Sequence, residues 1–140
     1  MHRKTLIALL GAIVMAVAAS GVALAAGSGP TVTVTIKTAT KTLRQATVRG
    51  EKGWITKGGT PKGKCSGDTA AGALDAATRG KWTAKYYASY SSVLVTSILG
   101  VKPKGQSAYW EFFVNGKPAS KGVCEIKLRT GQKLAFKLVG

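Results

Sequence analysis

The stretch that decides the fold is Tyr109-Trp110-Glu111-Phe112-Phe113-Val114-Asn115-Gly116-Lys117. Apolar residues alternate with others along it, on both sides of an Asn-Gly dipeptide. Asn-Gly accepts the positive φ angles of a two-residue hairpin turn better than almost any other pair, so the turn and the alternation both predict a β-hairpin.

The same alternation predicts strands on either side of this hairpin. In 31–37 the residues Val32, Val34 and Ile36 share one face, which we expect to be buried, and threonines occupy the other face. Further strands are expected at 42–48, 81–87, 93–99, 124–128 and 134–138. Gly and Lys dominate 50–64, which predicts a loop from which Trp54 and Ile55 pack back onto the body.

One helix is expected between Asp68 and Gly80. Small apolar residues recur at helical spacing from position 70 to position 77, Asp68 is placed to cap the first amides, and Gly80 is placed to end the helix. Asp75 and Arg79 are four residues apart, so an ion pair on the solvent side is expected. The predicted fold is therefore α+β, a mainly antiparallel β-sheet with one short helix.

The N-terminal residues have the pattern of a secretion signal. A basic start is followed by an apolar run, and Ala23-Leu24-Ala25 fits the signal peptidase rule, which predicts a signal peptide at 1–25. A flexible lead at 26–30 and a single domain at 31–140 would follow. The alternative is an uncleaved anchor, because the apolar run is about long enough to cross a bilayer. After cleavage no transmembrane segment is expected, and the protein would be secreted or extracytoplasmic, at the cell envelope.

The chain is strongly basic, with a net charge of +16 that becomes +14 when Arg3 and Lys4 leave with the signal peptide. The Lys and Arg residues are scattered without a long run, which is typical of a solvated surface and not of a nucleic-acid-binding tail. No specific nucleic acid partner is therefore expected. Attraction to anionic envelope polymers is expected, and it would weaken with salt.

Cysteine usage predicts one disulfide bond. Cys65 and Cys124 are the only two cysteines, and an even number in an exported chain favours pairing. Two cysteines supply only half of a tetrahedral metal site, and the single histidine, His2, lies in the predicted signal peptide. No metal and no cofactor are expected.

The sequence also argues against an enzyme. Catalysis by acid and base needs titratable groups close together, and 26–140 contain five carboxylates and no histidine. Gly58 to Lys64 superficially resembles a phosphate-binding loop but lacks its Gly-Lys-Ser/Thr ending. No catalytic residue is predicted.

Aromatic residues form the candidate binding surface. Tyr87 and Tyr90 lie at one strand junction, while Tyr109 and Phe113 share the strand face opposite to Trp110. If Trp110 is buried, Tyr109 and Phe113 are exposed and can contact a ligand or partner. The alternative is that all these rings serve only core or cross-strand packing.

Several separated blocks resemble the C-terminal module of the transcobalamin-like family, in its secreted bacterial branch of unknown function. The motif residues that match are Tyr109, Trp110, Asn115, Gly116 and Gly122. Other similar blocks are 54–57, 59–65, 70–75, 97–100 and 122–124. Gln132 departs from the family pattern, where an acidic residue is usual.

The resemblance implies a binding role more than it identifies a ligand. In vitamin B12 carriers this module covers a cobalamin held against a separate helical barrel, which this sequence does not contain. We therefore expect an exported, non-catalytic binding or adhesion module at the cell envelope, whose partner is an unknown envelope protein, polymer or small ligand. The alternatives are a soluble carrier of a small, cobalamin-like ligand and an electrostatic binder of anionic wall polymers.

Overall fold

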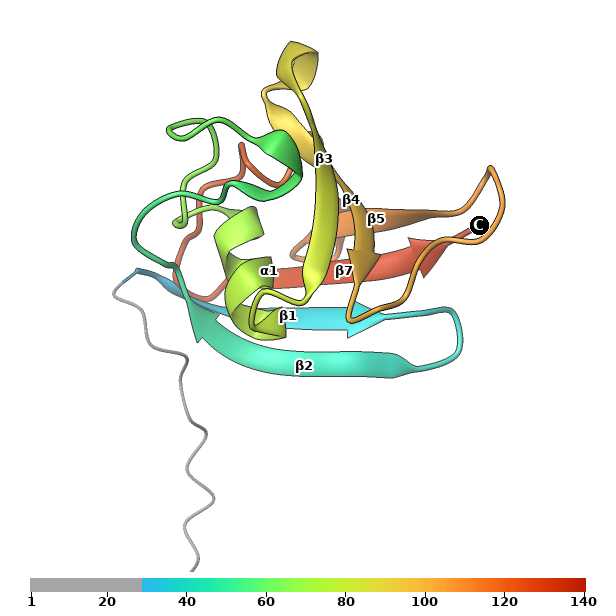
Figure 1. Ribbon diagram of the computed structural model, residues 1–140. Helices are drawn as coiled ribbons and strands as arrows, with labels where there is room; N and C mark the ends of the chain where they lie inside the picture. The colour runs from blue at the N-terminus through green and yellow to red at the C-terminus, as the bar shows by residue number, and fades with distance from the viewer. Residues whose placement is uncertain (1–28) are drawn as a thin grey trace, which may run out of the picture.

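The computed structural model describes residues 29–140 (Figure 1). The predicted signal peptide, 1–25, lies outside the described residues, as does most of the predicted lead at 26–30. In chain order the elements are β1 (Thr31–Lys37), β2 (Thr42–Arg49), the 3-10 helix η1 (Lys57–Gly59), α1 (Ala70–Thr78), β3 (Trp82–Tyr87), the 3-10 helix η2 (Ala88–Tyr90), β4 (Ser92–Ile98), β5 (Tyr109–Val114), β6 (Lys117–Pro118) and β7 (Lys133–Val139).

The strands of the described part form two sheets. A five-stranded sheet has the order β2-β1-β7-β5-β6, and β3 pairs with β4 in a separate two-stranded sheet. In Figure 1 the β3–β4 hairpin stands across the larger sheet, and α1 lies beside β1 and β2. The predicted fold, mainly antiparallel with one short α-helix, is confirmed. The exception to the antiparallel arrangement is β1, which pairs in parallel with β7.

The core fills the space between the sheets and α1. Val34 and Ile36 of β1, Leu74 of α1 and Phe136 of β7 are completely buried, which confirms the predicted inward face of the first strand. Phe112 stacks on Phe136 with ring centroids 5.0 Å apart. Each such side chain stabilises the fold by about 2 kcal/mol when it leaves water, so this cluster fixes how the two sheets sit relative to each other.

The predicted hairpin turn is confirmed. Asn115 and Gly116 have φ angles of 51° and 80°, and Val114 pairs directly with Lys117 across them. The Asn115 side-chain oxygen also accepts a hydrogen bond of 2.9 Å from the Lys133 amide. The turn is thereby tied to the last strand, and β5 lies in register with β7.

The start of the helix differs from the prediction. The N-cap position is Thr69 and not Asp68, and its side chain makes no cap hydrogen bond to the helix. The first amides, those of Ala70 and Ala71, donate instead to the carbonyls of Ile126 and Val123. A distant loop satisfies these donors, so no side-chain cap is required.

The end of the helix also differs. Arg79 adopts a left-handed conformation and serves as the C-cap, one residue before the expected Gly80. Among the described residues Asp75 and Arg79 form no ion pair, because Asp75 accepts a hydrogen bond of 2.7 Å from the Trp82 indole N–H. A helix that turns left-handed at Arg79 no longer places this side chain over Asp75.

Two further sequence predictions are corrected. The segment 124–128 is not a strand but a loop with one isolated bridge, Thr69 to Lys127, because it lies across the start of α1. Ile55 is buried as expected, whereas Trp54 is 46% exposed. Trp54 therefore packs onto the body only in part.

Candidate functional site

A hollow of about 630 Å³ opens at the tip of the β3–β4 hairpin. Tyr87, Tyr90 and Leu94 line its hairpin side, and the loop at 119–125 forms the opposite side. A second hollow, of about 300 Å³, runs between β4 and β5 and includes Tyr109. Leu94 lines both hollows, which therefore lie next to each other. We call the two hollows together, marked by Tyr87, Tyr90, Leu94 and Tyr109, the aromatic groove.

The local backbone explains why two tyrosines lie exposed at one end of the groove. β3 ends at Tyr87, and η2 follows at once with Ser91 in a left-handed conformation. This tight turn interrupts the strand alternation and leaves Tyr90 73% exposed. The rings of Tyr87 and Tyr90 meet edge to face at 6.4 Å, a favourable geometry that orders both rings. Lys85 lies 5.3 Å from the centre of the Tyr87 ring.

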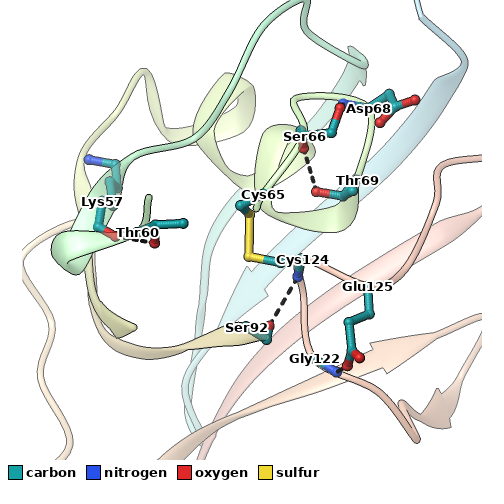
Figure 2. The surroundings of a disulfide bond; sticks show 10 residues. All are labelled: Lys57, Thr60, Cys65, Ser66, Asp68, Thr69, Ser92, Gly122, Cys124 and Glu125. Atoms are coloured by element: carbon teal, nitrogen blue, oxygen red, sulfur yellow. Dashed lines mark hydrogen bonds between the residues drawn. A yellow bond between two sulfur atoms is a disulfide. The ribbon is translucent and has the colours of Figure 1, made fainter. Parts of the chain in front are cut away.

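The disulfide fixes the loop side of the groove (Figure 2). Cys65 and Cys124 are bonded, as predicted, with a sequence separation of 59 residues. The amide of Cys124 donates to the buried hydroxyl of Ser92 at 3.2 Å, which ties the loop to the start of β4. Closing a chain loop of this length stabilises the fold by about 4 kcal/mol in the chain-entropy account.

Gly122 allows the closest approach between this loop and β4. A Cβ atom at position 122 would collide with the Ser92 hydroxyl, so glycine is required there by space. The Gly122 amide donates to the carboxylate of Glu125 at 3.0 Å, which closes the turn. Gly122 therefore shapes the groove, both hollows of which it lines.

The structure brings together three of the four residues proposed from sequence as a binding surface. Tyr87, Tyr90 and Tyr109 all line the aromatic groove. Phe113 does not, since its ring is half-buried beneath the ammonium of Lys137, at 4.3 Å. Tyr109 is 48% exposed and Trp110 is buried, its indole donating to the Val101 carbonyl at 3.3 Å. The face containing Trp110 is thus the inner face of β5.

Sequence reasoning missed Leu94, which is 49% exposed between two buried valines. The signal was present in the sequence. Thr96, two residues further on, is polar and lies on the same strand face, which indicates that this face is directed toward solvent.

Two carboxyl groups meet outside the groove. Burial, followed by the charge of Asp75 and a side-chain hydrogen bond to it, raises the pKa of Glu51 from 4.5 to about 7. Asp75 is held in place by the Trp82 indole. Neither of the two groups lines the aromatic groove.

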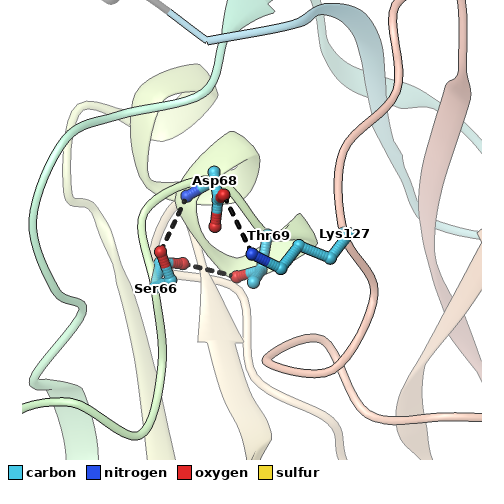
Figure 3. A network of polar contacts seen from close by, with 4 residues as sticks. All are labelled: Ser66, Asp68, Thr69 and Lys127. Carbon is cyan, nitrogen blue, oxygen red and sulfur yellow. Dashed lines mark hydrogen bonds and ion pairs between the residues drawn. The ribbon is translucent and has the colours of Figure 1, made fainter.

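Asp68 lies in a different polar network (Figure 3). A hydrogen bond from Ser66 and the ammonium of Lys127, 3.1 Å away, lower the pKa of this carboxyl, against the opposing effect of partial burial. The Thr69 hydroxyl donates to the Ser66 carbonyl, so the turn before α1 is closed by side chains. Asp68 therefore has a structural role.

The described residues do not provide a metal site. Within 29–140 no three His, Cys, Asp or Glu side chains gather around one point. The two cysteines are consumed by the disulfide, and Asp68 and Asp75 already have partners. As for membranes, none of the helices found in this part of the chain has the length and apolar character needed to span one.

One protein family matches the sequence. The model of the family described as "Domain of unknown function (DUF4430)" matches residues 67–140, more than half of the chain. The match covers α1, the loop at 119–125 that contains Cys124, and the strands that form the aromatic groove, whereas Cys65 lies two residues before it. No functionally curated protein matches the sequence.

Two solved structures share the fold. A proposed metal-binding protein from Ruminococcus gnavus ATCC 29149 is 10% identical with a TM-score of 0.59, over 79% of this chain and 96% of that one. Haptocorrin, solved in complex with Cbi, is 17% identical with a TM-score of 0.57, over 81% of this chain. This chain corresponds to only 26% of the haptocorrin chain. The transcobalamin-like fold predicted from the sequence motifs is therefore confirmed.

Proposed function

Since the chain belongs to the DUF4430 family, whose description assigns no ligand, we propose that it is an exported, non-catalytic binding or adhesion module of the cell envelope. Its ligand occupies the aromatic groove. Both structural neighbours are described by what they bind and not by a reaction.

One observation carries this proposal. Of the five large apolar side chains that are exposed in the described part of the chain, four lie at the aromatic groove: Tyr87, Tyr90, Leu94 and Tyr109. Water-exposed apolar groups cost free energy, and a contiguous set of them usually marks a binding surface. Tyrosine offers a large contact area at a small entropic cost, which suits recognition.

The proposed compartment is extracytoplasmic, with 1–25 as signal peptide, 26–30 as lead and 31–140 as the binding domain. The Cys65–Cys124 disulfide supports it, because such bonds form and persist in oxidising environments.

The test is co-sedimentation of the oxidised domain with envelopes of its own source cells, at low and at high salt. We expect binding that persists at about 1 M salt, where the Debye length is about 3 Å, and that falls at least about tenfold in Tyr90→Ser/Tyr109→Ser. Trp54→Ser is the matched control, since it removes an exposed aromatic ring outside the groove. If Trp54→Ser loses as much envelope binding as Tyr90→Ser/Tyr109→Ser, or if the double variant binds like wild type, the aromatic groove is excluded as the binding site.

The aromatic groove also favours a second function, a soluble carrier of a small ligand. Its larger hollow, about 630 Å³, falls within the range of small-molecule sites. The haptocorrin structure contains Cbi, so cobalamin is the natural first probe. Saturable cobalamin binding that Tyr90→Ser weakens would establish the carrier function, and a flat titration would exclude it for this ligand.

A further inference from the structure

A second groove adjoins the first on the other side of the loop at 119–121. It has a volume of about 440 Å³ and is bordered by β6 and by the loop that leads to β7. Four cationic side chains line it, which are Lys117, Lys121, Lys127 and Arg129. Its single acidic lining residue is Glu125. We call this the basic groove.

Three of these cations are available to a ligand. Lys127 is engaged by Asp68 at 3.1 Å, and the Glu125 carboxylate is engaged by the Gly122 amide. Within residues 29–140 the exposed side chains of Lys117, Lys121 and Arg129 make no hydrogen bond and no ion pair. Like charges held close together without partners favour an anion between them.

The two grooves share a wall. Ala119, Ser120, Lys121 and Glu125 line both of them, so a ligand that lies against the tyrosines can extend directly to the cations. The hydroxyl groups of Ser89 and Ser120 lie at the aromatic end and can both donate and accept hydrogen bonds. The other carboxylate at the aromatic groove, Glu111, lines only the hollow between β4 and β5.

We propose that the two grooves together bind an acidic glycan, a chain of sugar rings that carry carboxylate or phosphate groups. The flat C–H faces of the sugars lie on Tyr87 and Tyr90, and the acidic groups lie among Lys117, Lys121 and Arg129. This inference rests on the proposed function of the aromatic groove. Tyrosine fits sugars because its ring is apolar and its hydroxyl is polar.

Charge complementarity favours this ligand over a neutral glycan, because the chain that remains without the proposed signal peptide carries +14, which is +16 less Arg3 and Lys4. An acidic peptide would satisfy the cations but would leave the tyrosine faces without flat partners. Single-stranded nucleic acid offers both charge and rings, but the proposed compartment places acidic glycans and not nucleic acid within reach of this protein.

The test is a titration of the oxidised domain with five oligomers of equal length, followed by tyrosine and tryptophan fluorescence and by calorimetry. The probes are oligogalacturonate, its neutral methyl ester, a phosphorylated oligomannose, oligoglutamate and single-stranded DNA. We expect both acidic glycans to bind at least about tenfold more tightly than the ester and than oligoglutamate. Tighter binding of oligogalacturonate would identify carboxylate as the recognised group, and tighter binding of the phosphorylated oligomannose would identify phosphate. Single-stranded DNA that binds as tightly as the acidic glycans would overturn the inference.

The variant Lys117→Gln/Lys121→Gln/Arg129→Gln tests the basic groove. We expect it to weaken acidic glycan binding about tenfold, since each exposed ion pair changes affinity by about twofold, and to leave binding of the ester unchanged. Lys62→Gln/Lys102→Gln/Lys104→Gln is the matched control, which removes the same charge from exposed positions outside both grooves. Equal weakening in the two triple variants would mean that net charge alone attracts the ligand.

The two proposals fail in distinguishable ways. If Tyr90→Ser/Tyr109→Ser loses envelope binding but the domain does not prefer the acidic glycans to the ester, the groove stands as a binding site and the acidic ligand is wrong. If the same variant keeps full envelope binding, the proposed function itself is wrong.

Discussion

The raised pKa of Glu51 predicts a domain that loses stability as the pH rises from 4.5 to about 7. In the folded state the pKa of Glu51 is raised from 4.5 to about 7, by burial first and then by Asp75. Between these two values the folded state binds a proton that the unfolded state has released. The contribution of Glu51 is therefore most favourable below pH 4.5 and is lost as the pH rises to about 7.

The size of the effect follows from the same values. A rise from 4.5 to about 7 would correspond to about 3 kcal/mol if it acted in full, at about 1.4 kcal/mol for each pH unit. Because Glu51 is partly exposed, solvent screens the interaction, and we expect about 1 kcal/mol. Glu51→Gln keeps a neutral donor for Asp75, so it should stabilise the domain by about 1 kcal/mol at pH 8 and by almost nothing near pH 5.

Urea unfolding at pH 5, 6, 7 and 8, followed by tryptophan fluorescence, measures this free energy. Trp82 is a suitable probe because it is buried and its indole donates to Asp75. Asp68→Asn is the control: the pKa of Asp68 is lowered, so its contribution is lost only under more acidic conditions and should be constant over this range. If wild type and Glu51→Gln show the same change of unfolding free energy from pH 5 to 8, the reasoning is refuted.

Two further variants test the scaffold of the aromatic groove. Cys65→Ser/Cys124→Ser should lower the free energy of unfolding by about 4 kcal/mol, because it removes the disulfide. Urea unfolding of the oxidised wild type beside the variant measures this loss. A loss below about 1 kcal/mol would show that the disulfide does not stabilise the fold by restricting the unfolded chain. Gly122→Ala should lower the free energy of unfolding by about 1 to 3 kcal/mol, because the added methyl group would collide with Ser92. In thermal unfolding, Ser92→Gly added to the same chain should recover part of this loss. If it recovers none, the collision with Ser92 is not the cause.

Local patterns predicted the parts of this fold that local interactions determine. The turn at Asn115-Gly116 and the buried face of β1 both follow from neighbouring residues, whereas the pattern left open which face of β5 is buried. The loop at 124–128 shows the limit of this reasoning. Its alternation fits a strand, yet its carbonyls are needed by the first amides of α1, and no sequence window contains both segments.

The candidate site was predictable in part for the same reason. Exposure of Tyr90 follows from the turn next to it, whereas Phe113 is covered by Lys137, which lies on the strand beside it. The basic groove could not be predicted from sequence, because Lys117, Lys121 and Arg129 come together only through the fold. Scattered basic residues in a sequence thus do not show how charge is distributed on a surface.

The parallel pairing of β1 with β7 sets the order in which this domain can be completed. Thr33 lies opposite Lys133, so the middle of the larger sheet joins its first strand to its last. In the proposed export, a chain that enters the compartment from its N-terminus brings Val34 and Ile36 of β1 in early, whereas β7, which pairs with β1, comes last. Such distant contacts form late and slowly. We therefore expect the larger sheet to stay incomplete until nearly all of the domain has passed.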